Sequence, residues 1–101
     1  MIIQTPGFKA TKRLTKFVGD NVGKLTLLSD RILEGLVNLK LDKSGKKENK
    51  ICDIKLVMPG KDLFASRHSN TFEDAVQQSI EAVKHQVERW KASNTRGLGD
   101  H

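Results

Sequence analysis

The spacing of hydrophobic and polar positions changes several times along the chain, and each spacing predicts a different element. Residues 1–5 are partly apolar and are followed by a Pro-Gly pair, which predicts a short strand ending in a turn. A helical spacing begins after Thr11, whose hydroxyl can cap a helix N-terminus. Its apolar residues form one face: Leu14, Phe17, Val18, Val22, Leu25 and Leu28. Gly19 and Gly23 lie within this segment and disfavour a regular helix.

Three segments with strand character follow. Residues 33–43 and 52–58 alternate between apolar and polar side chains, which predicts strands with one buried face. Residues 44–49 have the composition of a hairpin loop, and residues 59–62 (Pro-Gly-Lys-Asp) that of a tight turn. Residues 63–68 are predicted to form the last strand.

The final helix has the most regular pattern in the chain. Its apolar and small residues recur along a single stripe: Phe72, Ala75, Val76, Ser79, Ile80, Val83, Val87 and Trp90. Asn70 or Thr71 is expected to cap this helix. Glu73 and Asp74 lie in its first turn, where negative charge complements the helix dipole. The stripe is therefore expected to pack on the core, with Trp90 against the edge of the sheet; a base-stacking role for Trp90 is the less favoured alternative.

The element order β-α-β-β-β-α predicts an α+β fold. The first strand–helix–strand link should be a right-handed crossover that makes the first two strands parallel. The next three strands should form an antiparallel meander. Because each strand has one apolar face, both helices should pack on the same side of a four-stranded mixed sheet, as in a double-stranded-RNA-binding domain. The 101 residues suffice for a single domain, residues 1–93, and residues 94–101 are expected to form a flexible tail.

Charge narrows the classes of partner. The chain has 18 Lys and Arg against 12 Asp and Glu, a formal net charge of +6, and such proteins are drawn to polyanions. No apolar run approaches the roughly 18 residues of a membrane span, and the N-terminus lacks the charged region of a secretory signal. The single cysteine, Cys52, cannot form an intramolecular disulfide. We therefore expect a soluble, cytoplasmic protein without a membrane partner.

Motifs for catalysis are absent from the sequence. There is no GxSxG, HExxH or P-loop pattern, and neither His68 nor His85 lies beside a candidate nucleophile. Cys52 and the three histidines, which include His101, lack the spacing of zinc ligands. Cys52 shares the apolar positions of its strand, which predicts a small buried hydrophobe. We expect no enzymatic activity, no metal, no cofactor and no small-molecule substrate.

Basic residues gather on the first helix. Residues 9–24 contain one acid, Asp20, and five basic side chains: Lys9, Lys12, Arg13, Lys16 and Lys24. An ordinary solvated face mixes both signs of charge, so this excess favours a surface that contacts phosphates. The hairpin loop also carries basic residues, at positions 43, 46, 47 and 50, opposed by Glu48. That loop fits an RNA-following role and a solubilising role equally well.

The charged side chains of the last helix are mostly acidic in its first turns and mostly basic in its later turns. The dipole explains part of this pattern. Four basic residues lie in its later turns: Lys84, His85, Arg89 and Lys91. Together with the five basic residues of the first helix, they make up the predicted rRNA-binding set.

Three segments, with the element order, carry a resemblance to a known family. The runs KLTLLSDRI (24–32), DLFAS (62–66) and TFEDAVQQSIEAVKHQVERWK (71–91) resemble those of the ribosome hibernation-promoting factors. This family includes the ribosome-associated inhibitor and the sigma-54 modulation proteins, and the resemblance covers Met1 to about Lys91. It implies a monomeric protein that binds the small ribosomal subunit and its rRNA in the mRNA and tRNA channel. It also implies silencing of translation in starved or stationary-phase cells.

The resemblance also assigns individual positions. A conserved basic position falls on Lys24, and the basic positions of the last helix fall on His85, Arg89 and Lys91. The chain departs from the family at Asn21, where the family has a lysine. It departs again at Glu81, Ala82 and Glu73, which replace an Asp-Lys pair and a Tyr. These departures shift the expected contacts toward the first helix.

Two alternatives remain. One is a stand-alone double-stranded-RNA-binding module, which uses a lysine cluster at the start of its last helix. Residues 71–74 (Thr-Phe-Glu-Asp) are acidic at that place, which weighs against it. The other is a protein-interaction modulator of transcription, as the sigma-54 name suggests.

Overall fold

The computed structural model describes residues 2–5, 9–45 and 47–99, with side chains as far as Ser93. Its sheet has four strands in the order β1-β2-β3-β4, namely β1 (Ile2–Gln4), β2 (Glu34–Leu41), β3 (Lys50–Met58) and β4 (Lys61–Ser69). β1 runs parallel to β2, and the other neighbouring strands are antiparallel. The predicted α+β class, element order and mixed sheet are therefore confirmed.

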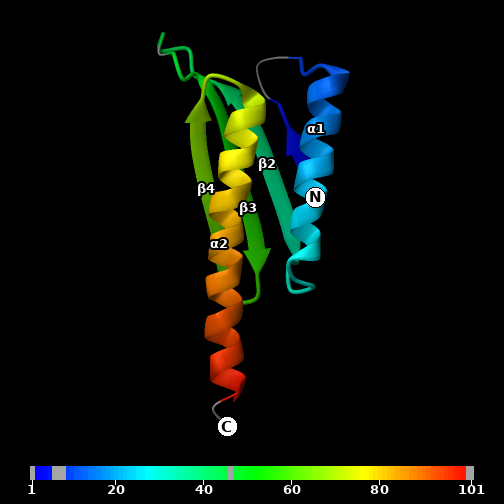
Figure 1. Cartoon of the computed structure of the whole chain (residues 1–101), viewed down its shortest axis with the longest axis vertical. Coiled ribbons are helices and arrows are strands. Elements are labelled where there is room, and N and C mark those ends of the chain that lie inside the picture. The colour runs from blue at the N-terminus through cyan, green and yellow to red at the C-terminus, as the bar shows by residue number, and fades with distance from the viewer. Residues whose placement is uncertain (1, 6–8, 46, 100–101) are drawn as a thin grey trace.

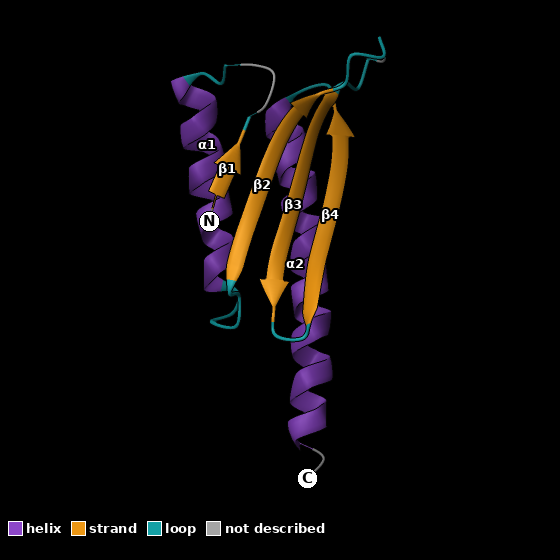
Figure 2. Cartoon of the chain, turned by 180° about the vertical axis from the view of Figure 1, so that it is seen from behind, coloured by secondary structure: helices purple, strands orange, loops and turns teal. Residues whose placement is uncertain are grey.

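Both helices cover the same face of this sheet (Figure 1), and the opposite face is open (Figure 2). The reason lies in the alternation of side chains along the strands. Val37, Ile54 and Ala65 point to the helices and are at most 3% exposed. Their neighbours along the strands point the other way. Cys52 lies among the buried residues, as its place in the alternation predicted.

The first helical segment has two parts. The α-helix α1 (Lys12–Gly23) continues directly into a 3-10 helix, η1 (Lys24–Leu27). Thr11 caps α1 as predicted, because its hydroxyl accepts a hydrogen bond of 3.1 Å from the backbone N–H of Leu14. The apolar positions after Val22 recur every three residues, which suits the three-residue turn of a 3-10 helix. Gly19 does not interrupt the helix, so the expected irregularity appears only at its end.

The second helix, α2 (Phe72–Gly99), is longer than the sequence predicted. Its N-cap is Thr71, whose hydroxyl accepts a hydrogen bond of 3.1 Å from the N–H of Asp74. The buried Ser79 hydroxyl donates to the carbonyl of Cys52 at 2.7 Å and ties the helix to β3. The polar composition after Ala92 suggested a helix end there, but the backbone continues helical to Gly99. No proline interrupts this segment, and a single glycine costs a helix only about 1 kcal/mol.

Candidate nucleic-acid interface

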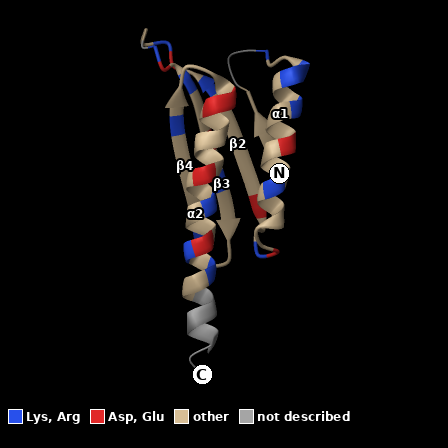
Figure 3. Cartoon of the chain, viewed as in Figure 1, with Lys and Arg blue, Asp and Glu red and all other residues tan. Residues whose placement is uncertain are grey.

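The basic residues of the first helical segment lie on its exposed side. Lys12, Arg13, Lys16 and Lys24 are exposed and lie opposite the buried stripe that includes Leu14, Val18 and Val22; Lys9, just before the helix, is exposed as well. Three ion pairs form among the described residues, and none of them involves these five side chains. We call these five residues the α1 basic surface; Figure 3 shows its cationic positions along α1. Asp20 lies one turn from both Lys16 and Lys24 on the same exposed side, so the surface keeps an excess of four positive charges.

Three hydrogen bonds, made by the side chains of Lys91 and Gln86, define the flanks of α2. Lys91 Nζ donates to the carbonyl of Leu28 at 2.9 Å, so this side of the helix faces the end of the first helical segment. The Gln86 side-chain amide bonds the backbone of Phe64, accepting from its N–H at 3.2 Å and donating to its carbonyl at 2.7 Å. That side therefore faces β4. An α-helix turns through about 100° per residue. Lys84, two turns before Lys91, thus lies on the α1 flank.

Arg89 lies on the other flank, three residues after Gln86. It lines a groove with Lys61 and Trp90 beside the turn that joins β3 and β4. His85 lies on the outer side of the helix, with its Nε2 3.2 Å from a carboxylate oxygen of Glu81. The structure therefore divides the basic residues predicted on the last helix among three directions, and it does not place Arg89 beside the α1 basic surface.

The hairpin loop between β2 and β3 presents two exposed lysines, Lys43 and Lys47. Lys50 is half-buried, and its Nζ donates to the side-chain oxygen of Asn49 at 2.8 Å. Lys46 lies outside the described residues. Two of the four basic residues noted in this loop are therefore exposed among the described residues.

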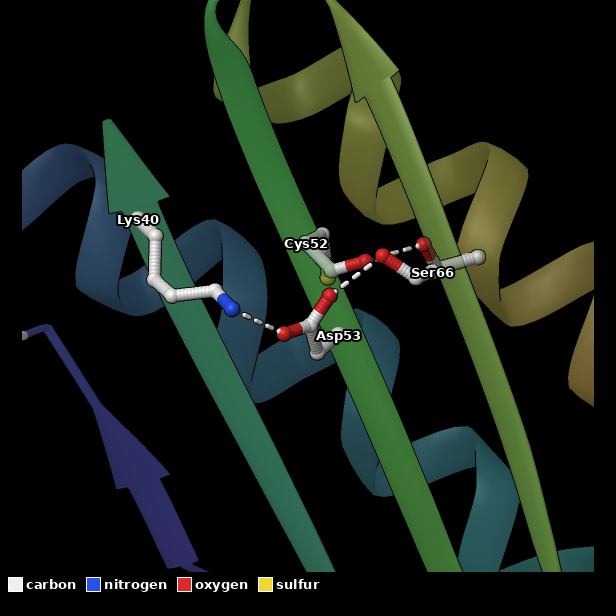
Figure 4. A network of polar contacts seen from close by, with 5 residues as sticks. Lys40, Cys52, Asp53 and Ser66 are labelled. Atoms are coloured by element: carbon white, nitrogen blue, oxygen red, sulfur yellow. Dashed lines mark hydrogen bonds and ion pairs between the residues drawn. The ribbon is translucent and has the colours of Figure 1, made fainter. Parts of the chain in front are cut away.

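The open face of the sheet pairs its charges internally. Lys40 on β2 lies 2.6 Å from a carboxylate oxygen of Asp53 on β3, and the Ser66 hydroxyl of β4 donates to the same carboxylate (Figure 4). Lys55 and Asp62 form a second pair at 3.4 Å. The strand alternation in the sequence placed Lys40, Asp53 and Lys55 on the polar face. Asp62 was expected in the tight turn of residues 59–62 and instead lies in β4, which begins at Lys61. Because the charges of both pairs cancel locally, this face offers little to a polyanion.

Other chemistry is limited within the described part of the chain. Those residues include no group of three or more His, Cys, Asp and Glu placed to hold a metal ion. None of the helices there has the length and apolar character needed to cross a bilayer. Burial raises the pKa of the Cys52 thiol to about 12, so this thiol stays protonated at neutral pH.

The fold and the α1 basic surface together define a small α+β domain suited to an anionic partner. The chain belongs to the sigma 54 modulation protein / S30EA ribosomal protein family, whose model matches residues 1–95. This bears out the resemblance noted in its sequence.

Two solved structures share the fold. A ribosomal subunit interface protein from Coxiella burnetii superposes with a TM-score of 0.77 at 19% identity, covering 91% of this chain and 99% of that chain. The N-terminal domain of Thermus thermophilus Protein Y gives 0.67 at 17% identity, covering 88% and 94%. No curated protein sequence matches the chain.

Proposed function

We propose that this protein binds the small ribosomal subunit through the α1 basic surface and, by occupying the channel for mRNA and tRNA, silences translation in starved or stationary-phase cells. Family membership supports a ribosomal partner. The similar structure from Coxiella burnetii, a ribosomal subunit interface protein, points the same way. The fold supplies a rigid sheet that holds both helices on one side.

The observation that carries the proposal is the absence of ion pairs at the α1 basic surface among the described residues. An rRNA phosphate gains most from a cation that no neighbouring carboxylate already compensates. Each such contact also releases a counterion from the RNA, which makes the binding salt-dependent. About five phosphate contacts would lower the affinity by about 10²-fold or more over a fourfold rise in salt.

A pair of charge-reversal variants tests the docking face. The helix variant combines Lys16→Glu with Lys24→Glu, and the control combines Lys43→Glu with Lys47→Glu in the hairpin loop. All four lysines are exposed, and each variant changes the net charge by four, two for each reversal. Such surface substitutions alter stability by only about 0.5 kcal/mol each.

Sedimentation with purified small subunits and inhibition of cell-free translation are the two measurements. We expect the helix variant to lose both activities and to show a shallower salt dependence, while the loop variant keeps both. A generic polyanion binder would respond to both variants alike. Equal binding by the two variants, or equal loss, would refute the docking face. Binding to RNA polymerase in place of ribosomes would favour a transcriptional role.

A further inference from the structure

A groove lies between the β3–β4 turn and α2, on the flank that faces away from α1. Its volume is about 670 Å³, within the roughly 300–1,000 Å³ of small-ligand sites. The turn contributes Pro59, Gly60 and Lys61, and the helix contributes Arg89 and Trp90, among other residues. Gly60 has a φ of +76°, a conformation that favours glycine and lets the chain reverse tightly at the rim.

The groove carries two cations. Among the residues with described side chains, its charged lining residues are Lys61 and Arg89, and no carboxylate lines it. Both side chains are exposed, and neither takes part in an ion pair among the described residues. A ligand that complements this wall is anionic, and the planar guanidinium of an arginine suits the oxygens of a phosphate.

The remaining lining adds an aromatic wall. Trp90 is half-buried, packs partly against the core and still borders the groove. Ser93 adds a hydroxyl, whereas the amide of Gln86 is already bonded to the backbone of Phe64 and forms a fixed part of the wall. An indole beside two cations matches a ligand with a flat base and a phosphate, because nucleobases stack on aromatic side chains.

We propose that this groove binds a nucleoside phosphate, with its base against Trp90 and its phosphate between Lys61 and Arg89. The ligand has two sources with the same chemistry, a free mononucleotide and one nucleotide of an RNA strand. The site is separate from the α1 basic surface, because Arg89 lies on the β4 flank of α2. Its occupancy therefore does not depend on docking through Lys16 and Lys24.

The fluorescence of Trp90 provides a direct measurement. The chain has one tryptophan and no tyrosine, so the emission comes from Trp90 and no other residue contributes to it. The whole protein is titrated with adenosine monophosphate, adenosine, inorganic phosphate and a short oligoadenylate. We expect a saturable change with adenosine monophosphate. Adenosine and phosphate should each bind about tenfold or more weaker, because each retains only part of the contacts.

Variants locate the site, with binding followed by equilibrium dialysis and folding by circular dichroism. Arg89→Gln and Lys61→Gln should each weaken the binding of adenosine monophosphate about tenfold. Trp90→Leu should weaken it about fivefold or more, and Trp90→Phe should keep more of it because a ring remains. Lys84→Gln is the matched control, since it removes the same charge from the opposite flank of the same helix, and it should bind like the unaltered protein.

The outcomes separate the sources and the two proposals. Oligoadenylate binding about tenfold tighter than adenosine monophosphate identifies an RNA nucleotide, and equal affinities identify a free nucleotide. The Lys16→Glu, Lys24→Glu variant should still bind nucleotide, whatever happens to its ribosome binding. If neither adenosine monophosphate nor oligoadenylate binds saturably at millimolar concentration, the proposed site is refuted. It is equally refuted by a loss in Lys84→Gln as large as in Arg89→Gln.

Discussion

Truncation of Val83 on α2 is expected to destabilise the protein strongly, because this side chain is 0% exposed and lies mid-stripe against the sheet. Val83→Ala removes two methyl groups, worth about 0.8 kcal/mol each in lost burial. The surroundings close the resulting cavity only in part, which brings the total to about 2–3 kcal/mol. In a domain of this size, a loss of about 2–3 kcal/mol lowers the melting temperature by about 10–20 °C.

Urea denaturation followed by far-UV circular dichroism measures this loss. Gln77→Ala is the control, because Gln77 is an exposed residue of the same helix. The midpoint should fall for Val83→Ala with an unchanged slope, since the surface exposed on unfolding hardly changes. Ile80 is half-buried and should lose less stability per methyl group removed. If the midpoint of Val83→Ala moves no further than that of Gln77→Ala, the packing of α2 on the sheet is wrong.

Three further predictions concern single side chains. The Cys52 thiol, with its pKa raised to about 12, should resist alkylation from pH 7 to 9 in the folded protein, and a rate rising with pH like that of a free thiol would contradict its burial. Gln86→Ala should free the backbone of β4 at Phe64 and cause concentration-dependent association in light scattering, unlike Gln77→Ala. Thr71→Ala should cost about 1 kcal/mol in the same urea assay through loss of the α2 cap, and no measurable change would argue against that cap.

Much of the fold could be predicted because strand alternation carries tertiary information. The alternation in residues 33–43 and 52–58 determines which side chains face the helices, and the crossover rule makes β1 and β2 parallel. The 3-10 turn at Lys24–Leu27 was missed, although the three-residue spacing after Val22 was visible in the sequence. The end of α2 was predicted too early, because the residues after Ala92 are weak helix formers but include no proline, so the sequence does not define where the helix ends.

The candidate site was harder to predict than the fold. Arg89 and Lys91 were grouped through family positions, yet residues two apart on a helix differ by about 200° and cannot share a flank. The spacing alone contained this signal. The neighbours of each flank did not follow from the spacing, because the groove at Arg89 depends on a turn near residue 60, far away in sequence. The bond between Lys91 and Leu28 likewise joins residues 63 positions apart.

Charged residues are paired with one another on the open face of the sheet but not on the α1 basic surface. This difference determines which side of the protein can bind an anionic partner. On the open face, Asp53 is bonded to both Lys40 and Ser66, so its charge is met within the sheet. Loss of the Lys40–Asp53 pair would therefore change the stability of the protein and not its affinity for a partner. Salt weakens this pair as it weakens other surface ion pairs. On the helical side, no residue of the α1 basic surface forms an ion pair among the described residues. These side chains can therefore contact the phosphates of a partner. The salt dependence of ribosome binding should therefore follow charge changes at Lys16 and Lys24, and Lys40→Gln should leave that dependence unchanged.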